Sequence, residues 1–147
     1  METIDIRLLS PHPRNKKIYG DEDVTFLVER IRESKWIKPL IVTQNNTIIS
    51  GHSRWQAALT LGYEQLEVER RTCKDETEEL EFLLLENVQR LKTPLQMVRE
   101  GEMWNEIETE KARQRKLSTL QQNISTLNRT IDYSSVPLNL TERKNNL

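Results

Sequence analysis

The chain has 147 residues, of which 35% are hydrophobic and 31% charged, and this length and composition fit one domain with a real core and a solvated appendage. No apolar run approaches the length of a membrane span, and the N-terminus lacks the basic start and apolar stretch of a secretory signal, so we expect a cytoplasmic protein without membrane contacts. The single cysteine, Cys73, excludes an internal disulfide and a cysteine metal cluster.

The first third of the chain predicts a strand, an extended loop and a helix. Residues 4–9 alternate enough for a short strand, and Pro11 and Pro13 then force an extended loop that carries Arg14. The acidic residues 21–23 open a helix with apolar side chains at i, i+3, i+4 and i+7, which indicates one buried face. That face consists of Val24, Leu27, Val28 and Ile31.

The central third predicts a hairpin that leads directly into a glycine and a helix. Residues 40–43 and 47–50 are two β-rich runs joined by a Gln-Asn-Asn turn. The helix after Gly51 is expected to bury one face, formed by Trp55, Ala58 and Leu59, and to end at Gly62.

The junction at Gly51 is a candidate phosphate site. Glycine lets the backbone turn tightly and approach a ligand, the first-turn N–H groups of a helix face negative charge, and Arg54 adds a forked cationic donor. The alternative interpretation is an ordinary strand-to-helix turn with a surface arginine.

The remaining elements complete an α+β domain. Residues 66–70 alternate and predict a strand, and Asp75 with Glu78 resembles a capping box at the start of a helix that ends near residues 86–87. Thr93-Pro94-x-Gln96 begins a further helix. We expect a core at residues 1–92, a helix at 93–118 and a flexible, polar tail at 119–147.

The charge is distributed unevenly between the two parts of the chain. Residues 1–110 hold 15 basic and 21 acidic side chains, whereas residues 111–147 hold 7 basic and 2 acidic ones. A basic extension on an acidic domain suits contact with nucleic acid or an acidic partner, although a solvated helix end explains it equally well. No helix-turn-helix fits convincingly in residues 119–147.

Three short motifs occur in a characteristic order. They are Pro11-His12-Pro13-Arg14, then Gly51-His52-Ser53-Arg54-Trp55-Gln56-Ala57, then Glu86-Asn87-Val88-Gln89-Arg90. Over roughly residues 4–107 this order resembles the N-terminal domain of ParB-like proteins, which belongs with sulfiredoxin and is also described as a ParB-like nuclease domain. The resemblance implies a small mixed sheet with flanking helices.

The resemblance also implies a nucleotide site, with CTP a better candidate than ATP, together with Mg²⁺. It places Gly51, His52, Ser53 and Arg54 at the phosphates, with Arg14 and Arg90 closing the site and Glu86 and Asn87 serving the metal. A triphosphate bears about four negative charges, so helix N–H groups, arginine forks and a hard cation suit it. The candidate catalytic residues are Glu86 and His52, the latter as a general base or as an orienting group.

The phosphate motif departs from the family pattern at three positions. The family's glutamate is His52 here, its first arginine is Ser53 and its third is Gln56. Losing two cations would weaken phosphate binding. Sulfiredoxin's nucleophilic cysteine corresponds to Gly51, so that chemistry is set aside.

Three functions follow from these motifs. The first is a nucleotide switch in a DNA-associated partition or transcription-control protein, located on the nucleoid or a plasmid, that self-associates and is reset by slow CTPase activity. DNA would be contacted through the basic tail or through a region outside this chain. The second is a metal-dependent nuclease, and the third is an inert relative kept for protein contacts.

Overall fold

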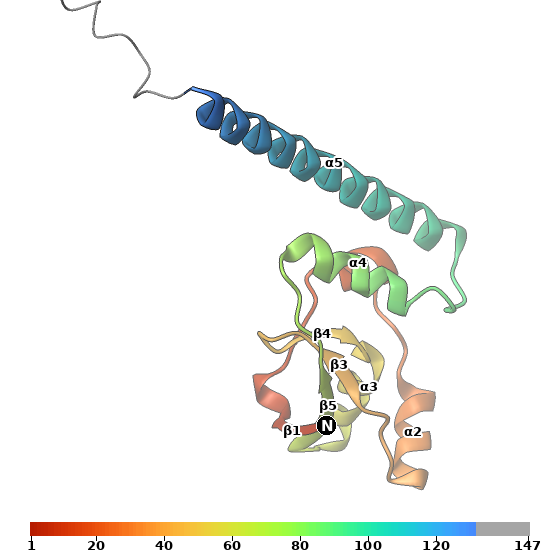
Figure 1. Ribbon diagram of the computed structural model, residues 1–147. Coiled ribbons are helices and arrows are strands. Elements are labelled where there is room, and N and C mark those ends of the chain that lie inside the picture. The colour runs from red at the N-terminus through yellow and green to blue at the C-terminus, as the bar shows by residue number, and fades with distance from the viewer. Residues whose placement is uncertain (132–147) are drawn as a thin grey trace, which may run out of the picture. The chain divides into compact units, whose positions relative to one another are not determined.

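The computed structural model describes residues 1–131, which form five strands, five α-helices and one 3₁₀ helix (Figure 1). In chain order the elements are β1 (Glu2–Asp5), η1 (Ile6–Leu8), β2 (Ser10–Pro11), α1 (Asn15–Tyr19), α2 (Thr25–Ser34), β3 (Leu40–Val42), β4 (Thr47–Ser50), α3 (His52–Leu61), β5 (Gln65–Arg70), α4 (Glu76–Glu86) and α5 (Pro94–Thr130). The chain divides into two compact units, Met1–Glu108 and Thr109–Leu147.

The strands form one mixed sheet in the order β1-β5-β3-β4-β2. The β1–β5 and β3–β4 pairs are antiparallel, whereas β3–β5 and β2–β4 are parallel. Helix α3 therefore serves as the crossover between the hairpin and the parallel strand β5. The predicted α+β class, with a small mixed sheet, flanking helices and a long C-terminal helix, is confirmed.

The first strand differs from the prediction. It covers Glu2–Asp5 and not residues 4–9, because the chain turns into η1 directly after Asp5. The Asp5 carboxylate accepts a hydrogen bond of 2.9 Å from the backbone N–H of Arg7 and so caps this turn. The turn still buries Ile6, which explains why an alternating pattern continued beyond the strand.

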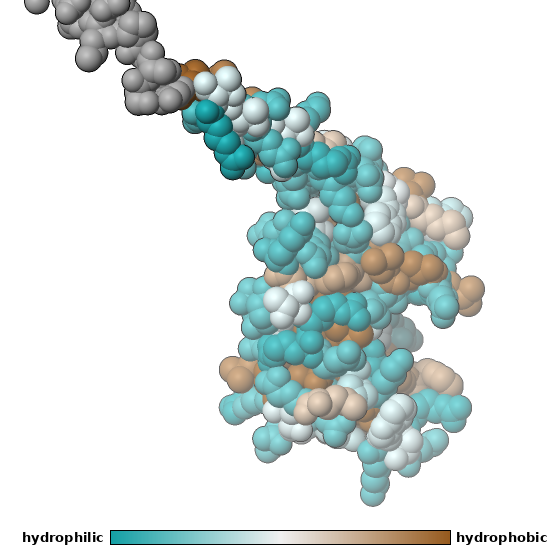
Figure 2. Space-filling view, in the orientation of Figure 1, coloured by the Kyte–Doolittle hydropathy of each residue, from teal (hydrophilic) through white to brown (hydrophobic). Residues whose placement is uncertain are grey.

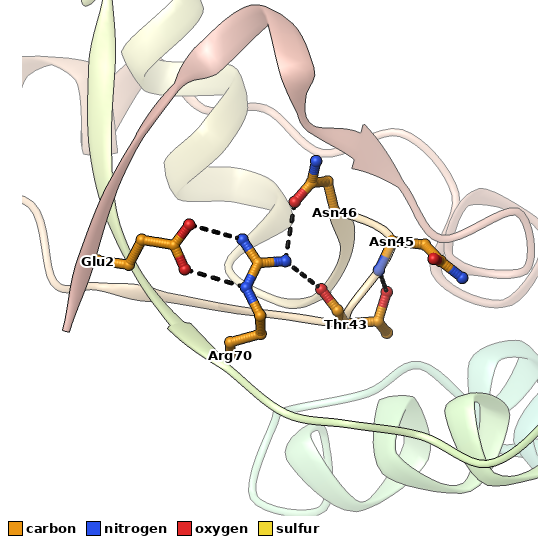
Figure 3. A network of polar contacts seen from close by, with 5 residues as sticks. All are labelled: Glu2, Thr43, Asn45, Asn46 and Arg70. Carbon is orange, nitrogen blue, oxygen red and sulfur yellow. Dashed lines mark hydrogen bonds and ion pairs between the residues drawn. The ribbon is translucent and has the colours of Figure 1, made fainter.

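Arg70, the last residue of β5, links β1 to the turn between β3 and β4 (Figure 3). Its guanidinium forms a bidentate pair with Glu2 on β1, with bonds of 2.9 and 3.0 Å. Its Nη1 also donates to the carbonyl of Thr43 and to Oδ1 of Asn46, at 2.8 and 2.9 Å. Since Asn46 has a φ of 64°, this side-chain contact helps to hold a left-handed turn residue.

Three apolar clusters hold the first unit together. The largest lies under the sheet, a second joins α2 to α3, and a third joins α1, α4 and the first turns of α5 through Ile18, Tyr19, Leu83, Leu84 and Ile107. In the space-filling view the visible surface is mainly hydrophilic and is interrupted by apolar patches (Figure 2).

The buried face of α3 differs from the predicted one. Ala57 and Ala58 are fully buried, whereas Leu59 is 46% exposed and Trp55 is only partly buried. The face is rotated toward α2, because Ala57 packs against Val28 and Ile31. Small residues at these positions let the two helices approach each other closely.

Helix α5 continues through Thr130, beyond the predicted end at residue 118. No proline or glycine stands between residues 102 and 130, so the polar residues after 118 lower helix propensity without interrupting the hydrogen-bond ladder. The expected flexible tail thus begins as helix, and its part after residue 131 lies outside the described residues. Within residues 1–131 no helix is long and apolar enough to cross a membrane.

Candidate functional site

Gly51 makes the sharp turn between β4 and α3. Its φ is +106°, and a Cβ atom there would lie 2.7 Å from Cγ of Leu40 and 3.0 Å from Nη2 of Arg54. Only glycine fits this position without strain and collision. Because Gly51 has no side chain with which to cap the helix, the first-turn N–H groups of α3 keep their attraction for an anion.

Arg54 lies on the first turn of α3, but its guanidinium is engaged with the protein. Nη1 donates to the carbonyl oxygens of Lys38 and Pro39 at 2.8 and 2.7 Å, and Nη2 donates to Oγ of Ser50 at 3.3 Å. Burial lowers the pKa of Arg54, while the charge of Glu86 acts in the opposite direction. Arg54 therefore holds the segment that leads into β3. Its role at the phosphates stays a prediction.

His52 connects the start of α3 to the proline loop. Its Nε2 accepts a hydrogen bond of 3.1 Å from the backbone N–H of His12, and Nδ1 of His12 accepts one of 3.0 Å from the backbone N–H of Arg14. Burial lowers the pKa of both imidazoles to about 4, and in His12 the charge of Arg14 contributes to this shift. Both rings are neutral at pH 7 and act as acceptors, which favours the orienting role for His52 over that of a general base.

Arg14 is paired with α5. Its two terminal nitrogens donate to the carboxylate of Glu106 at 2.8 and 2.9 Å, and Nη1 also lies 3.3 Å from Sδ of Met103. These hydrogen bonds lower the pKa of Glu106 and raise that of Arg14. The proline loop is thereby held against the first unit's part of α5.

Glu22 joins two residues of the predicted nucleotide site, Ser53 of the phosphate motif and Arg90, which is expected to close the site. Its carboxylate accepts a hydrogen bond from Oγ of Ser53 and forms an ion pair with the guanidinium of Arg90. The same guanidinium stacks over the ring of Tyr19, with its central carbon 4.5 Å from the ring centroid. Ser53 and Arg90, 37 positions apart in sequence, thus share one anionic partner.

Behind Arg90 lies a buried polar group that holds the loop between α4 and α5. The hydroxyl of Tyr19 donates to Glu100 at 2.6 Å, and Nζ of Lys92 pairs with the other oxygen of Glu100 at 3.0 Å. Gln96 donates to the carbonyl of Tyr19 at 2.9 Å. Burial and the Glu100 bond raise the pKa of Tyr19, so its hydroxyl stays protonated.

Glu86 and Asn87 stand at the C-terminal end of α4. Glu86 pairs with Arg71 at 3.0 Å, and Nδ2 of Asn87 donates to the carbonyl of Leu83 at 2.7 Å. The side-chain oxygen of Asn87 is thereby left for another partner. Among residues 1–131 no group of three or more histidine, cysteine, aspartate or glutamate side chains is arranged to hold a metal, so a cation here would take most of its ligand oxygens from water or a bound phosphate.

The structure groups the predicted residues unevenly. His52 and Arg14 meet through His12, and Ser53 and Arg90 meet through Glu22. Glu86 instead pairs with Arg71 and Asn87 bonds to Leu83, and neither pair includes another predicted site residue, although the charge of Glu86 acts to raise the pKa of Arg54. Sequence reasoning assigned the acidic run 21–23 to a helix start and missed Glu22. The sequence carried no signal for this role, because the start of α2 at Thr25 and the contacts of Glu22 with distant residues are known only from the structure.

Comparison with known proteins agrees with the fold. Residues 1–88 match the model of the ParB N-terminal domain family. The chain is 35% identical over 60 residues to the "ParB-like nuclease domain-containing protein YnaK" of Escherichia coli K12, covering 41% of this chain and 69% of that protein. It is 34% identical over 92 residues to the "Probable chromosome-partitioning protein ParB" of Treponema pallidum, covering 59% of this chain but 28% of that protein.

Solved structures give the same result. A Pnob8-like ParB-N domain superposes with a TM-score of 0.66 at 19% identity, over 79% of this chain and 49% of the other. The C-terminally truncated ParB of Caulobacter crescentus, complexed with CTP-γ-S, superposes with a TM-score of 0.52 at 26% identity, over 76% of this chain and 64% of the other. The chain therefore belongs to the ParB N-terminal domain family.

Proposed function

We propose that this chain is the nucleotide-binding module of a DNA-associated partition or transcription-control protein, with CTP as its preferred ligand. The observation that carries the proposal is the Gly51 turn, which leaves the first turn of α3 without a side-chain cap, together with Ser53 and Arg90, which both contact the carboxylate of Glu22. The Caulobacter relative was solved in complex with CTP-γ-S, and another structure of that protein was solved with its centromeric parS site.

The contacts of Glu22 support an anion site at Ser53 and Arg90. A hydroxyl and a guanidinium that converge on one carboxylate form the same donor set that binds a phosphate oxygen. A phosphate at this position has to displace Glu22. Because Glu22 lies in the short segment between α1 and α2, its release would free that segment to rearrange.

This displacement suggests how nucleotide binding could act as a switch. Arg90 is held by Glu22 and Tyr19, and the loop after it is held by the contacts of Glu100 with Tyr19 and Lys92. A ligand that takes Arg90 from Glu22 changes the partners of both segments, which biases the domain toward a second arrangement. Self-association on DNA would be the output of that change.

Glu86 and Asn87 are the residues that would hold Mg²⁺. One carboxylate and one amide oxygen fit a cation that keeps most of its ligands from water and phosphate. When bound, the metal would neutralise charge on the phosphates. Glu86 would have to exchange Arg71 for the metal, a small cost since both side chains of that pair are about one third exposed.

Equilibrium binding tests the proposal. The purified chain is titrated with CTP, ATP and GTP, each with and without Mg²⁺, by isothermal calorimetry. We expect magnesium-dependent binding with a preference for CTP. No binding of any nucleotide at millimolar concentration would overturn the proposal and favour a module that serves protein contacts only.

The second candidate function is metal-dependent cleavage of DNA. It is favoured by the likeness to the Escherichia coli protein, which is named for a ParB-like nuclease domain and of which 69% is covered. Incubation of supercoiled plasmid with the chain and Mg²⁺ or Mn²⁺ tests it. Nicking that disappears in Glu86→Gln would support a nuclease, whereas intact plasmid would reject it.

A further inference from the structure

The C-terminal half of α5 carries an apolar stripe with a seven-residue period. Its members occupy alternate spacings of three and four residues and are Leu117, Leu120, Ile124, Leu127 and Ile131. All five are between 39% and 57% exposed. The backbone N–H of Ile131 donates to the carbonyl of Leu127 at 2.9 Å, so the helical geometry extends to the last member. Figure 2 shows both apolar and hydrophilic atoms on the surface of α5 near its C-terminal end.

The period identifies the kind of surface that this stripe forms. Spacings of three and four residues average 3.5 per turn, which is the repeat of a left-handed coiled coil, and no other described element covers these five exposed side chains. In a heptad written abcdefg, Leu117, Ile124 and Ile131 take the a positions, and Leu120 and Leu127 take the d positions. The stripe is therefore suited to a partner helix with the same period.

We propose that residues 117–131 form a parallel, two-stranded coiled coil with a second copy of this chain. β-Branched residues at a combined with leucine at d favour two parallel strands, and Ile124 and Ile131 at a with Leu120 and Leu127 at d follow that rule. This surface lies entirely in the unit Thr109–Leu147 and uses none of the residues assigned to the nucleotide, so it is a contact between copies that does not require nucleotide binding.

The flanking residues are compatible with a second copy as the partner. The e and g positions next to the stripe are Lys116, Gln121, Asn123, Asn128 and Thr130, of which only Lys116 is charged. In a parallel pair of identical helices, a g residue faces the e residue five positions later on its partner, so Lys116 meets Gln121 and Asn123 meets Asn128. Two copies thus meet without like-charge repulsion, and no row of charges selects a different helix.

The stripe is short, so we expect a weak dimer. It spans just over two heptads, or roughly 21 Å of helix, whereas stable coiled coils usually have three or more heptads. Upstream, the pattern is interrupted by Glu110 and Arg113, which pair with each other within the helix at 2.6 Å. Association should therefore depend on protein concentration in the micromolar to millimolar range.

Sedimentation equilibrium of the full chain without nucleotide tests the inference. Ile124→Glu introduces a charge at the centre of the stripe and should weaken dimerisation about tenfold or more. Gln122→Glu adds the same charge at the outer f position and should leave dimerisation unchanged. A wild-type chain that stays monomeric at every concentration, or equal effects of the two variants, would overturn the proposal.

Cysteine cross-linking tests the parallel orientation. Leu117→Cys is combined with Cys73→Ala, and mild oxidation should then link two identical chains faster than in the outer-face control Ser118→Cys. In an antiparallel pair an a residue instead meets a d residue of its partner, so a mixture of Ile124→Cys chains with Leu120→Cys or Leu127→Cys chains would give mainly the mixed disulfide. That result would overturn the parallel arrangement. Circular dichroism of each variant confirms that a loss of association is not a loss of helix.

Discussion

The backbone N–H of His12 donates a 3.1 Å hydrogen bond to Nε2 of His52, which joins the proline loop to the first turn of α3. His12 is buried and His52 is half-buried, and burial lowers the pKa of each imidazole to about 4. The bond requires an unprotonated Nε2 on His52. The two ends of the candidate site are therefore connected through a group that must remain neutral.

This relationship predicts a loss of stability in mild acid. A histidine whose folded-state pKa lies below its unfolded value of about 6.5 takes up a proton preferentially in the unfolded chain. The contribution of the neutral histidine to the free energy of unfolding is complete above pH 6.5 and is lost as the pH falls toward 4. It amounts to roughly 1 to 3 kcal/mol for each histidine. Urea unfolding between pH 7.5 and 4 measures it.

His52→Gln is the matched variant for that measurement. Its amide oxygen can accept the His12 bond and does not titrate, so the fall in unfolding free energy between pH 6.5 and 4 should become shallower. A variant with the wild-type pH profile would show that His52 does not carry the effect.

Glu22→Gln should increase nucleotide affinity. The substitution removes the negative charge that competes for Arg90 and Ser53, so a phosphate no longer has to displace an anion. We expect the dissociation constant for CTP to fall several-fold, measured by calorimetry. Asp21→Asn makes the same change of net charge on the same segment, where Asp21 pairs with Lys16 at 3.3 Å, and should have little effect.

Arg54→Ala should reduce stability as well as phosphate binding. Its guanidinium satisfies the carbonyl oxygens of Lys38 and Pro39, and their loss should cost about 1 to 3 kcal/mol of unfolding free energy. Thermal and urea unfolding provide the measurement. Arg32→Ala removes an exposed pair within α2 and should cost under about 1 kcal/mol. Equal costs for the two variants would mean that the Arg54 contacts do not stabilise the fold.

Glu86→Gln should abolish the magnesium dependence of nucleotide binding while leaving the fold intact. It removes the charge that would attract Mg²⁺, and the partly exposed pair with Arg71 is worth at most about 1 kcal/mol. Arg71→Gln breaks the same pair but keeps the carboxylate, so it should preserve the magnesium dependence. If both variants bind CTP with the wild-type response to Mg²⁺, Glu86 is not a metal ligand.

The sequence by itself determined the local elements of this protein. The hairpin, the turn at Gly51, the Asp75 cap of α4 and the Thr93-Pro94 start of α5 depend on residues within a few positions of each other. Short-range sterics and capping decide such features, so they can be predicted without knowledge of the fold.

Only the tertiary structure decided which side chains meet. The pairing of β3 with β5, the rotation of α3 toward Val28, and the meeting of Glu22 with Ser53 and Arg90 depend on contacts between distant segments. Arg54 shows the reason most clearly: its motif predicts a phosphate ligand, but carbonyl groups that folding brings to its guanidinium also bind it. A sequence motif specifies the chemistry of a side chain, whereas the packing of the chain determines which partner it contacts.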